Sequence, residues 1–230
     1  MIQITHLTKT YGRARGVTDL SLHVPRGSCF GFIGPNGAGK STTIRTLLGL
    51  ISPTAGEARV MGLDCVRDRA AILAQVGYMP SEAVFYPEMR VSEVIRLSAD
   101  LRKRDCREEA AALCEALGLD GRKRIRELSL GNRKKVSIVC AMQHRPALYV
   151  LDEPTSGLDP LVQRDFWLQV DRRRREGATV FLSSHVLYEV QRYCDRAAVI
   201  REGRLVIEGT TAELDIENRF FEYYEGGNGI

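Results

Sequence analysis

Residues 34–42 of this 230-residue sequence read Gly34-Pro35-Asn36-Gly37-Ala38-Gly39-Lys40-Ser41-Thr42, which matches the phosphate-binding pattern G-x-x-x-x-G-K-[ST]. The apolar run before it, over 29–33, predicts a buried parallel strand, and the apolar spacing over 44–48 predicts a helix. Glycines let the backbone curl so that successive N–H groups converge on a phosphate, and a helix start adds its positive dipole end. We therefore predict a nucleotide site in which Lys40 reaches the β/γ-phosphates and Ser41 holds Mg²⁺.

Length and composition favour one large α/β domain over 1–230, because two full domains would need a longer chain. The formal net charge of +4 is modest, and the arginine-rich runs lie near predicted helix ends, so nucleic acid is not an expected partner. Six cysteines show no C-x-x-C spacing, which suits a reducing cytosol. No apolar run approaches the ~18 residues that span a bilayer, and no signal peptide is recognisable. Any membrane role is therefore expected to come through a partner.

The apolar pattern also predicts how the domain is organised. Period-two alternation over 1–24 predicts antiparallel strands, and 57–62 predicts an edge strand. From Ser81 to about Leu119 the spacing becomes helical. We expect a helical subdomain at about 82–145 and a short tail over 211–230.

Two adjacent carboxylates follow the apolar strand predicted over 147–151. Asp152 and Glu153 are costly to hold at the end of a buried strand without a cation or water partner. Asp152 suits an outer ligand of Mg²⁺, and Glu153 suits a base for an attacking water. Asp159 is predicted to cap the helix that Pro160 opens.

Two further segments are compatible with phosphate chemistry. Ser129 begins a predicted helix; it is either a helix cap alone or, with Gly131, a second anion site. His185 follows the strand predicted over 178–182, on the rim expected for Lys40 and Asp152, although a lone histidine is more often structural.

Several aromatic residues leave alternatives open. Tyr11 is either a core aromatic or a ring that stacks on a base beside the loop. The segment 83–87 is either a surface for a partner or a small core under the helical insert. Phe220, Tyr223 and Tyr224 would share a helical face that docks on the domain or meets a partner.

The order of the motifs in this sequence resembles that in the nucleotide-binding subunits of ABC transporters. These motifs are the phosphate loop, the Ser-x-Gly helix start, the Asp-Glu strand end, residues 156–159 and His185. The resemblance covers 2–210 and implies an α/β P-loop NTPase core with a mixed, mainly parallel sheet, an N-terminal antiparallel β subdomain and a helical insert. The amino-acid sequence over 78–82, 128–135 and 152–160 is most similar to that of ATPases of ABC-2 type exporters.

The resemblance implies a role for each matching residue. Tyr11 stacks on adenine, Asp152 is the Walker B acid, Glu153 is the base, and His185 contacts the γ-phosphate. The signature motif over 128–132 contacts ATP bound to the opposite subunit, and Asp159 links the two sites. The nucleotide-binding residues implied are Tyr11, Gly34, Pro35, Asn36, Gly37, Ala38, Gly39, Lys40, Ser41, Thr42, Ser129, Gly131, Asn132 and Asp159. The catalytic residues implied are Glu153, His185, Lys40 and Ser81, and the Mg²⁺ ligands are Ser41, Asp152 and Ser81.

The sequence departs from the family pattern at three positions. Ser81 stands where the family usually has glutamine, so a bridging water or Glu82 would have to complete the contact with the metal. Leu130 replaces a usual glycine and Asn132 a usual glutamine. Hydrolysis is therefore expected to be slower or more dependent on a partner.

The expected function is that of an ATP-hydrolysing motor that uses ATP and Mg²⁺, pairs as a homodimer or with a second ABC subunit, and drives a separate membrane permease, for export. The expected location is peripheral, on the cytoplasmic side of the cell membrane. The alternative is a soluble ABC-type ATPase acting on nucleic acid, the ribosome or an assembly scaffold.

Overall fold

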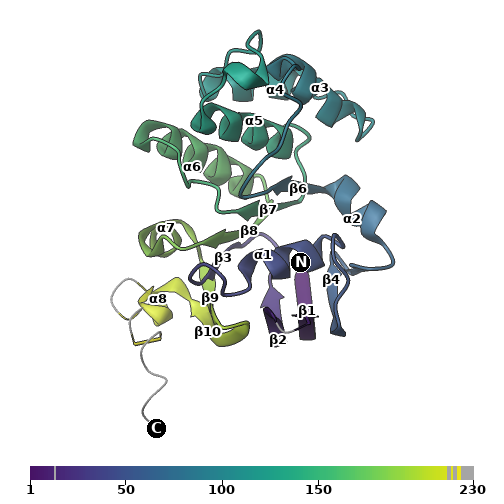
Figure 1. Ribbon diagram of the computed structural model, residues 1–230. Helices are drawn as coiled ribbons and strands as arrows, with labels where there is room; N and C mark the ends of the chain where they lie inside the picture. The colour runs from purple at the N-terminus through teal and green to yellow at the C-terminus, as the bar shows by residue number, and fades with distance from the viewer. Residues whose placement is uncertain (13, 217–218, 220–221, 224–230) are drawn as a thin grey trace. The chain divides into compact units, whose positions relative to one another are not determined.

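The computed structural model describes residues 1–12, 14–216, 219 and 222–223, which form two compact units (Figure 1). Unit 1 comprises Met1–Leu73 and Thr179–Ile230, and unit 2 comprises Ala74–Ala178. Phe220 and Tyr224, which the sequence places on a shared helical face, lie outside the described residues. Tyr223 lies inside them and donates a hydrogen bond from its hydroxyl to the carbonyl of Leu214 at 2.8 Å.

Unit 1 contains an antiparallel sheet in the strand order β2-β1-β4-β5. Its strands are β1 (Ile2–Tyr11), β2 (Ala14–Val24), β4 (Ala55–Val60) and β5 (Leu63–Asp64). The antiparallel pairing predicted for 1–24 is confirmed, with Ile2 opposite Val24. The prediction of an edge strand at 57–62 is wrong. Because the chain turns back after Val60, β5 pairs with the outer side of β4, with Arg59 opposite Asp64.

Unit 1 also contains strands in the order β10-β9-β3-β8, in which β3 runs parallel to both β8 and β9, and β10 is antiparallel to β9. These strands are β3 (Cys29–Ile33), β8 (Thr179–Ser184), β9 (Arg196–Arg201) and β10 (Arg204–Thr210). The helices are α1 (Lys40–Leu47), α7 (Leu187–Tyr193) and α8 (Thr211–Leu214), and α2 (Arg69–Gln75) contains the boundary with unit 2. Helix α7 packs directly on β3, because a Cβ at Gly31 would lie 2.3 Å from a methyl carbon of Val190.

Unit 2 combines the parallel strand pair β6 (Val76–Met79) and β7 (Leu148–Asp152) with helices that lie together in Figure 1. The helices are α3 (Val91–Asp100), α4 (Arg107–Ala116), the 3₁₀ turn η1 (Ile125–Glu127), α5 (Leu130–Met142) and α6 (Pro160–Arg175). The segment 82–145, predicted as the helical subdomain, thus holds α3 to α5.

The prediction that helical structure begins at Ser81 is wrong. Helix α3 begins only at Val91, where Glu93 accepts a hydrogen bond from the Arg90 backbone N–H at 2.7 Å and so forms half of a capping box. Pro87 lies just before this start, and a proline restricts the residue before it to extended backbone. Leu101 follows the last residue of this helix and is 74% exposed.

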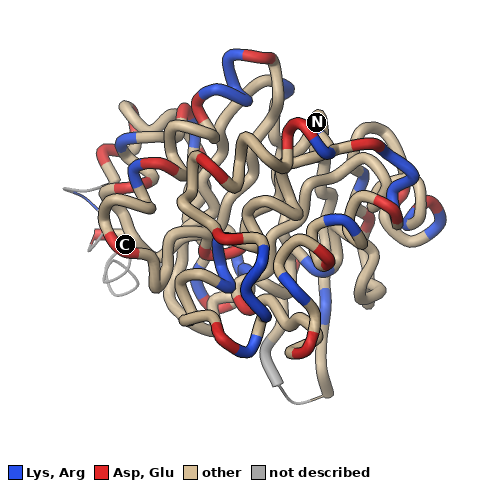
Figure 2. The backbone as a smooth tube through the Cα atoms, turned by 90° about the horizontal axis from the view of Figure 1, so that it is seen from above, with Lys and Arg blue, Asp and Glu red and all other residues tan. Residues whose placement is uncertain are grey.

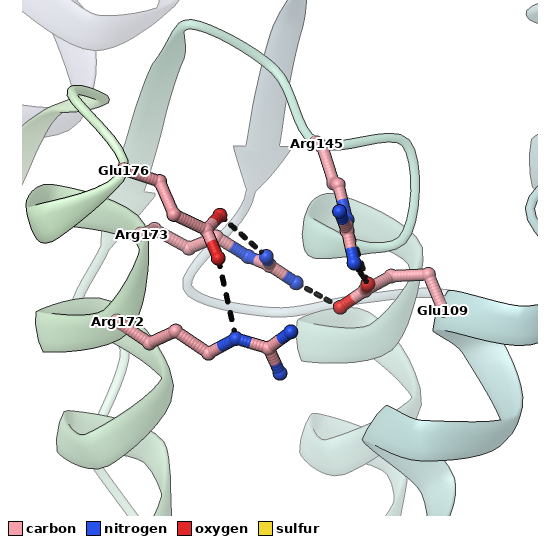
Figure 3. Close-up of polar contacts among 5 residues, drawn as sticks. All are labelled: Glu109, Arg145, Arg172, Arg173 and Glu176. Carbon is pink, nitrogen blue, oxygen red and sulfur yellow. Dashed lines mark hydrogen bonds and ion pairs between the residues drawn. The ribbon is translucent and has the colours of Figure 1, made fainter.

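A buried ion network ties α4 to the end of α6 within unit 2 (Figure 3). Arg173 of α6 is 1% exposed and lies between Glu109 and Glu176, to which it donates hydrogen bonds. Arg145, just after α5, also pairs with Glu109. The hydrogen bond from Arg173 lowers the pKa of Glu176 below its usual value. One buried carboxylate therefore joins three segments that are distant in the sequence.

This network predicts a large loss of stability when one member is removed. Glu109→Ala leaves the Arg173 cation buried beside a single remaining acid, and breaking a buried pair from one side costs about 3–5 kcal/mol. Chemical denaturation should show this loss. The double variant Glu109→Leu/Arg173→Met should be closer to the wild type, because no unpaired charge stays buried. Glu176→Ala is the control and should cost less, since that side chain is 42% exposed. Equal losses for Glu109→Ala and Glu176→Ala would contradict this explanation.

Candidate functional site

In unit 1 the predicted phosphate loop lies between β3 and α1. Residues 35–37 are exposed, and Gly37 and Gly39 have φ angles of 80° and 108°, the left-handed region that favours glycine. A Cβ at Gly37 would meet no protein atom within 4 Å, so the space beside the loop is open. The loop backbone and the start of α1 can therefore receive an anionic group.

Lys40 reaches back along this loop from the first turn of α1. Its Nζ atom donates hydrogen bonds to the carbonyls of Gly34 at 2.5 Å and Pro35 at 3.2 Å, and the side chain is buried. Ser41, the next residue, is half-buried on the same turn. An ammonium held at the loop is placed to attract phosphate oxygens.

Backbone contacts within unit 1 hold the loop in shape. The N–H of Gly203, in the β9–β10 turn, donates to the carbonyl of Ala38 at 2.9 Å, and the N–H of Thr18 donates to the carbonyl of Gly203 at 2.8 Å. A Cβ at Gly34 would lie 2.5 Å from the carbonyl oxygen of Ile200. The loop is thus bounded by β9 and its turn, which in turn bonds to β2.

Tyr11 lies at the end of β1, on the hairpin that borders this loop. A Cβ at Gly16 would lie 3.5 Å from the Tyr11 ring, and a Cβ at Gly39 would lie 3.2 Å from the carbonyl oxygen of Gly16. Tyr11 is 43% exposed, and the Lys9 ammonium lies 5.2 Å from the centre of its ring. The ring is therefore no core aromatic, and it remains accessible near the loop.

His185 lies beside the phosphate loop in unit 1. Strands β3 and β8 are parallel, and Ile33 is opposite Ser184, so Gly34 and His185 leave adjacent strands at the same edge. Neighbouring strands are separated by roughly 4.8 Å. His185 is exposed, as a side chain that contacts a ligand at this edge must be.

In unit 2 the structure brings together Ser81, Asp152 and Glu153. Met79 of β6 is opposite Leu151 of β7, so the chain leaves both parallel strands at one edge and places these three residues there. Asp152 is 2% exposed. Glu153 has a φ of 50°, a strained conformation for a residue with a side chain, and such strain clusters at functional sites.

Ser129 and Asp159 both cap helices in unit 2, as the sequence predicts. The Asn132 N–H donates to Ser129 Oγ at 3.3 Å, so the Ser129 hydroxyl keeps its own proton to donate elsewhere. Asp159 Oδ1 accepts from two N–H groups at the start of α6, both at 3.1 Å. Helix α5 starts against the loop before α6, because a Cβ at Gly131 would lie 3.4 Å from the carbonyl oxygen of Gly157.

Lys134 is a residue that the sequence reasoning missed. It is 8% exposed, and its Nζ atom donates to the carbonyls of Glu153 and Ser156, both at 2.6 Å. The available signal was its position, since Lys134, Ile138 and Met142 are spaced four residues apart and so share one face of α5. A lysine on the buried face of a helix indicates a specific acceptor.

The loop of unit 1, at the carboxyl end of a parallel strand and before a helix, defines a nucleotide-binding α/β protein. Residues 17–156 match the ABC transporter family model, and the chain belongs to this family as an ATP-binding cassette.

Curated relatives and solved structures agree with this assignment. The chain is 35% identical over 223 residues to the probable multidrug ABC transporter ATP-binding protein YbhF of Escherichia coli strain K12, covering 95% of this chain and 38% of that protein. It is 35% identical to the bacitracin transport ATP-binding protein BcrA of Bacillus licheniformis, covering 95% of this chain and 72% of the relative. A structure described as the ATP-binding subunit of an ABC transporter superposes with a TM-score of 0.88 at 30% identity, covering 98% of both chains. The predicted family and α/β fold class are confirmed, while the roles of single site residues stay predictions.

The close packing around Gly34 leads to a test. Gly34→Ala should destabilise the protein by about 1–3 kcal/mol, because overpacking forces backbone shifts, and should weaken ATP binding because the loop moves. Thermal unfolding and nucleotide titration measure the two effects. Gly121→Ala is the control, since a Cβ there would lie 3.5 Å from its nearest neighbour, at ordinary contact distance. A Gly34→Ala protein that matches this control in both measurements would refute the packing argument.

Proposed function

We propose that this chain is the ATP-hydrolysing motor subunit of an ABC exporter, which dimerises around two ATP molecules and drives a separate membrane permease. The observation that carries the proposal is the open loop over 34–42, with the Lys40 ammonium held against it and His185 at the adjacent strand end. The chain spans 38% of the length of the first relative and 72% of the second, so activity, cargo and partners are inferred.

The side chains present fit Mg²⁺ together with ATP. Mg²⁺ in nucleotide sites takes one or two protein oxygen ligands and completes its shell with phosphate oxygens and water. Within the described ranges, no group of three or more His, Cys, Asp or Glu residues could hold a metal by itself. Ser41 and Asp152, with Ser81 through water, are the ligands we propose. The metal would neutralise charge on the phosphates during hydrolysis.

Each remaining site residue then has a chemical task. Glu153 accepts the proton of the attacking water, and His185 donates to the γ-phosphate. Tyr11 stacks on adenine through its accessible ring. In a dimer, the free proton of the Ser129 hydroxyl would donate to the γ-phosphate on the opposite subunit, and Asp159 would hold the start of α6 beside that site.

Export is supported by the relatives, whose names refer to multidrug and bacitracin transport. The location that goes with this function is peripheral, at the cytoplasmic face of the membrane. Among the described residues no helix is long and apolar enough to cross a membrane. Basic and acidic residues are interspersed along the backbone in Figure 2, and such mixing gives no reason to expect a nucleic-acid partner.

Replacing the proposed base should separate ATP binding from hydrolysis. Glu153→Gln should reduce kcat by about 10²–10⁴-fold while ATP still binds, so a dimer should accumulate in size-exclusion chromatography with ATP. Lys40→Ala should instead weaken ATP binding itself and form no such dimer. Wild-type turnover by Glu153→Gln would disprove the assignment of the base.

The segment 83–87 supplies the surface that we propose for the permease. Val84 is 94% exposed and Tyr86 is 71% exposed, whereas Phe85 is half-buried. The exposure of Val84 and Tyr86 favours the interpretation that this segment is an interaction surface over the interpretation that it is a small core. Large exposed apolar groups mark interaction sites.

Val84→Asp/Tyr86→Asp should therefore uncouple ATPase activity from transport in vesicles that contain the permease, while basal ATPase activity persists. Val66→Asp is the matched control, because Val66 is also exposed, at 49%, but lies in unit 1. Normal transport by the double variant would argue against this surface.

A further inference from the structure

Lys134 connects the start of α5 with the loop that follows β7, all within unit 2. Its Nζ atom bonds to the carbonyls of Glu153 and Ser156 at 2.6 Å each. It follows Ser129, the N-cap of α5, by five residues on the same helix. A single ammonium thus fixes two points of the loop from the helix that carries the Ser-x-Gly motif.

The physical chemistry of these bonds makes them strong restraints. Hydrogen bonds from an ionised donor are shorter and about twice as strong as neutral ones. Lys134 is 8% exposed, so little water competes for the two carbonyls. If the donor were removed, those two carbonyls would lose a charged hydrogen-bond partner inside the protein, which is unfavourable.

The restraint acts at a backbone position that is itself strained. Glu153 has a φ of 50°, and residues in such sparsely populated regions persist only where the surroundings over-determine them. The bond from Lys134 holds the carbonyl of this same residue. The Glu153 side chain extends from this backbone position. Its direction therefore depends on the hydrogen bond from Lys134.

We propose that Lys134 is a positioning residue for hydrolysis, which couples the position of α5 to the aim of the Glu153 carboxylate. The proposal rests on the proposed role of Glu153 as the base. Because Ser129 and Gly131 start the same helix, anything that binds there and shifts α5 would move the base through Lys134. A purely structural lysine would stabilise the fold and leave the chemical step alone.

Two substitutions at this position separate positioning from stability. Lys134→Met keeps most of the length of the side chain and removes all donors, whereas Lys134→Gln has a similar length and supplies two amide N–H donors. We expect Lys134→Met to lower kcat by about 10- to 100-fold, the scale of a 1 Å misplacement, with the KM for ATP within about twofold of the wild type. Lys134→Gln should recover most of that loss. Lys135→Met, at the adjacent half-buried lysine, is the control and should behave as the wild type.

Steady-state ATPase kinetics with Mg²⁺ and ATP, and the melting temperature, are measured for each variant. Equal kcat losses for Lys134→Met and Lys134→Gln would overturn the proposal, as would a loss that appears only in KM or only in the melting temperature. If Lys134→Met does not fold, Lys134→Gln is compared with a second variant. In that case Lys134→Leu, which also lacks a donor, takes the place of Lys134→Met. A lower kcat for Lys134→Leu than for Lys134→Gln at unchanged KM supports positioning, and equal kcat values overturn it.

A double-mutant cycle with Glu153→Gln tests whether the effect passes through the base. In the Glu153→Gln background, Lys134→Met should cause little further loss of single-turnover rate, and independent, additive losses would overturn the proposed route. If Glu153→Gln alone hydrolyses ATP at the wild-type rate, the role of Glu153 in the proposed function fails. That result is distinguishable from failure of the Lys134 proposal, which shows as an unchanged kcat in Lys134→Met.

Discussion

The phosphate loop of unit 1 keeps its shape because other backbone segments lie against it at distances that leave no room for a side chain. The carbonyl of Ile200 bounds it at Gly34, and the N–H of Gly203 bonds to Ala38. The same turn bonds to β2, which leads back to the hairpin that carries Tyr11. The loop, the Tyr11 ring and the ends of the strands are therefore positioned by one group of contacts, in which glycines let the backbone segments approach closely.

Unit 2 relies on buried cations instead. Arg173 lies between two carboxylates, and Lys134 lies between two carbonyls, so each cation has acceptors that offset the cost of leaving water. The first joins helices α4 and α6, and the second joins helix α5 to the loop that carries Glu153. Stability and the geometry of the acidic loop thus depend on charged groups placed where apolar residues would ordinarily pack.

The sequence predicted those parts of the site whose chemistry is local. A glycine pattern, a serine at a helix start and an aspartate before a proline each act on their own neighbours, and the loop, Ser129 and Asp159 were found in this way. The short helices α2 and α7 have too few turns to show a periodic stripe and were missed. Helix α3 starts later than the apolar spacing predicted. Its start is fixed by the capping contact between the Arg90 backbone N–H and the Glu93 side chain. Lys134 was missed because its acceptors lie 19 and 22 residues away.

The ion network around Glu109 has a consequence for how this sequence can vary. A single change at Glu109 or Arg173 leaves the other charge buried with one partner fewer, whereas a paired change to apolar residues removes both charges. The two positions, 64 residues apart, are therefore constrained to be exchanged together during divergence. The side chain of Arg145 is 58% exposed, so water can hydrate it when its partner is lost. Substitutions at this position can therefore occur independently of the other two. Covariation among relatives should accordingly link α4 to α6 and leave the segment after α5 out of the pair.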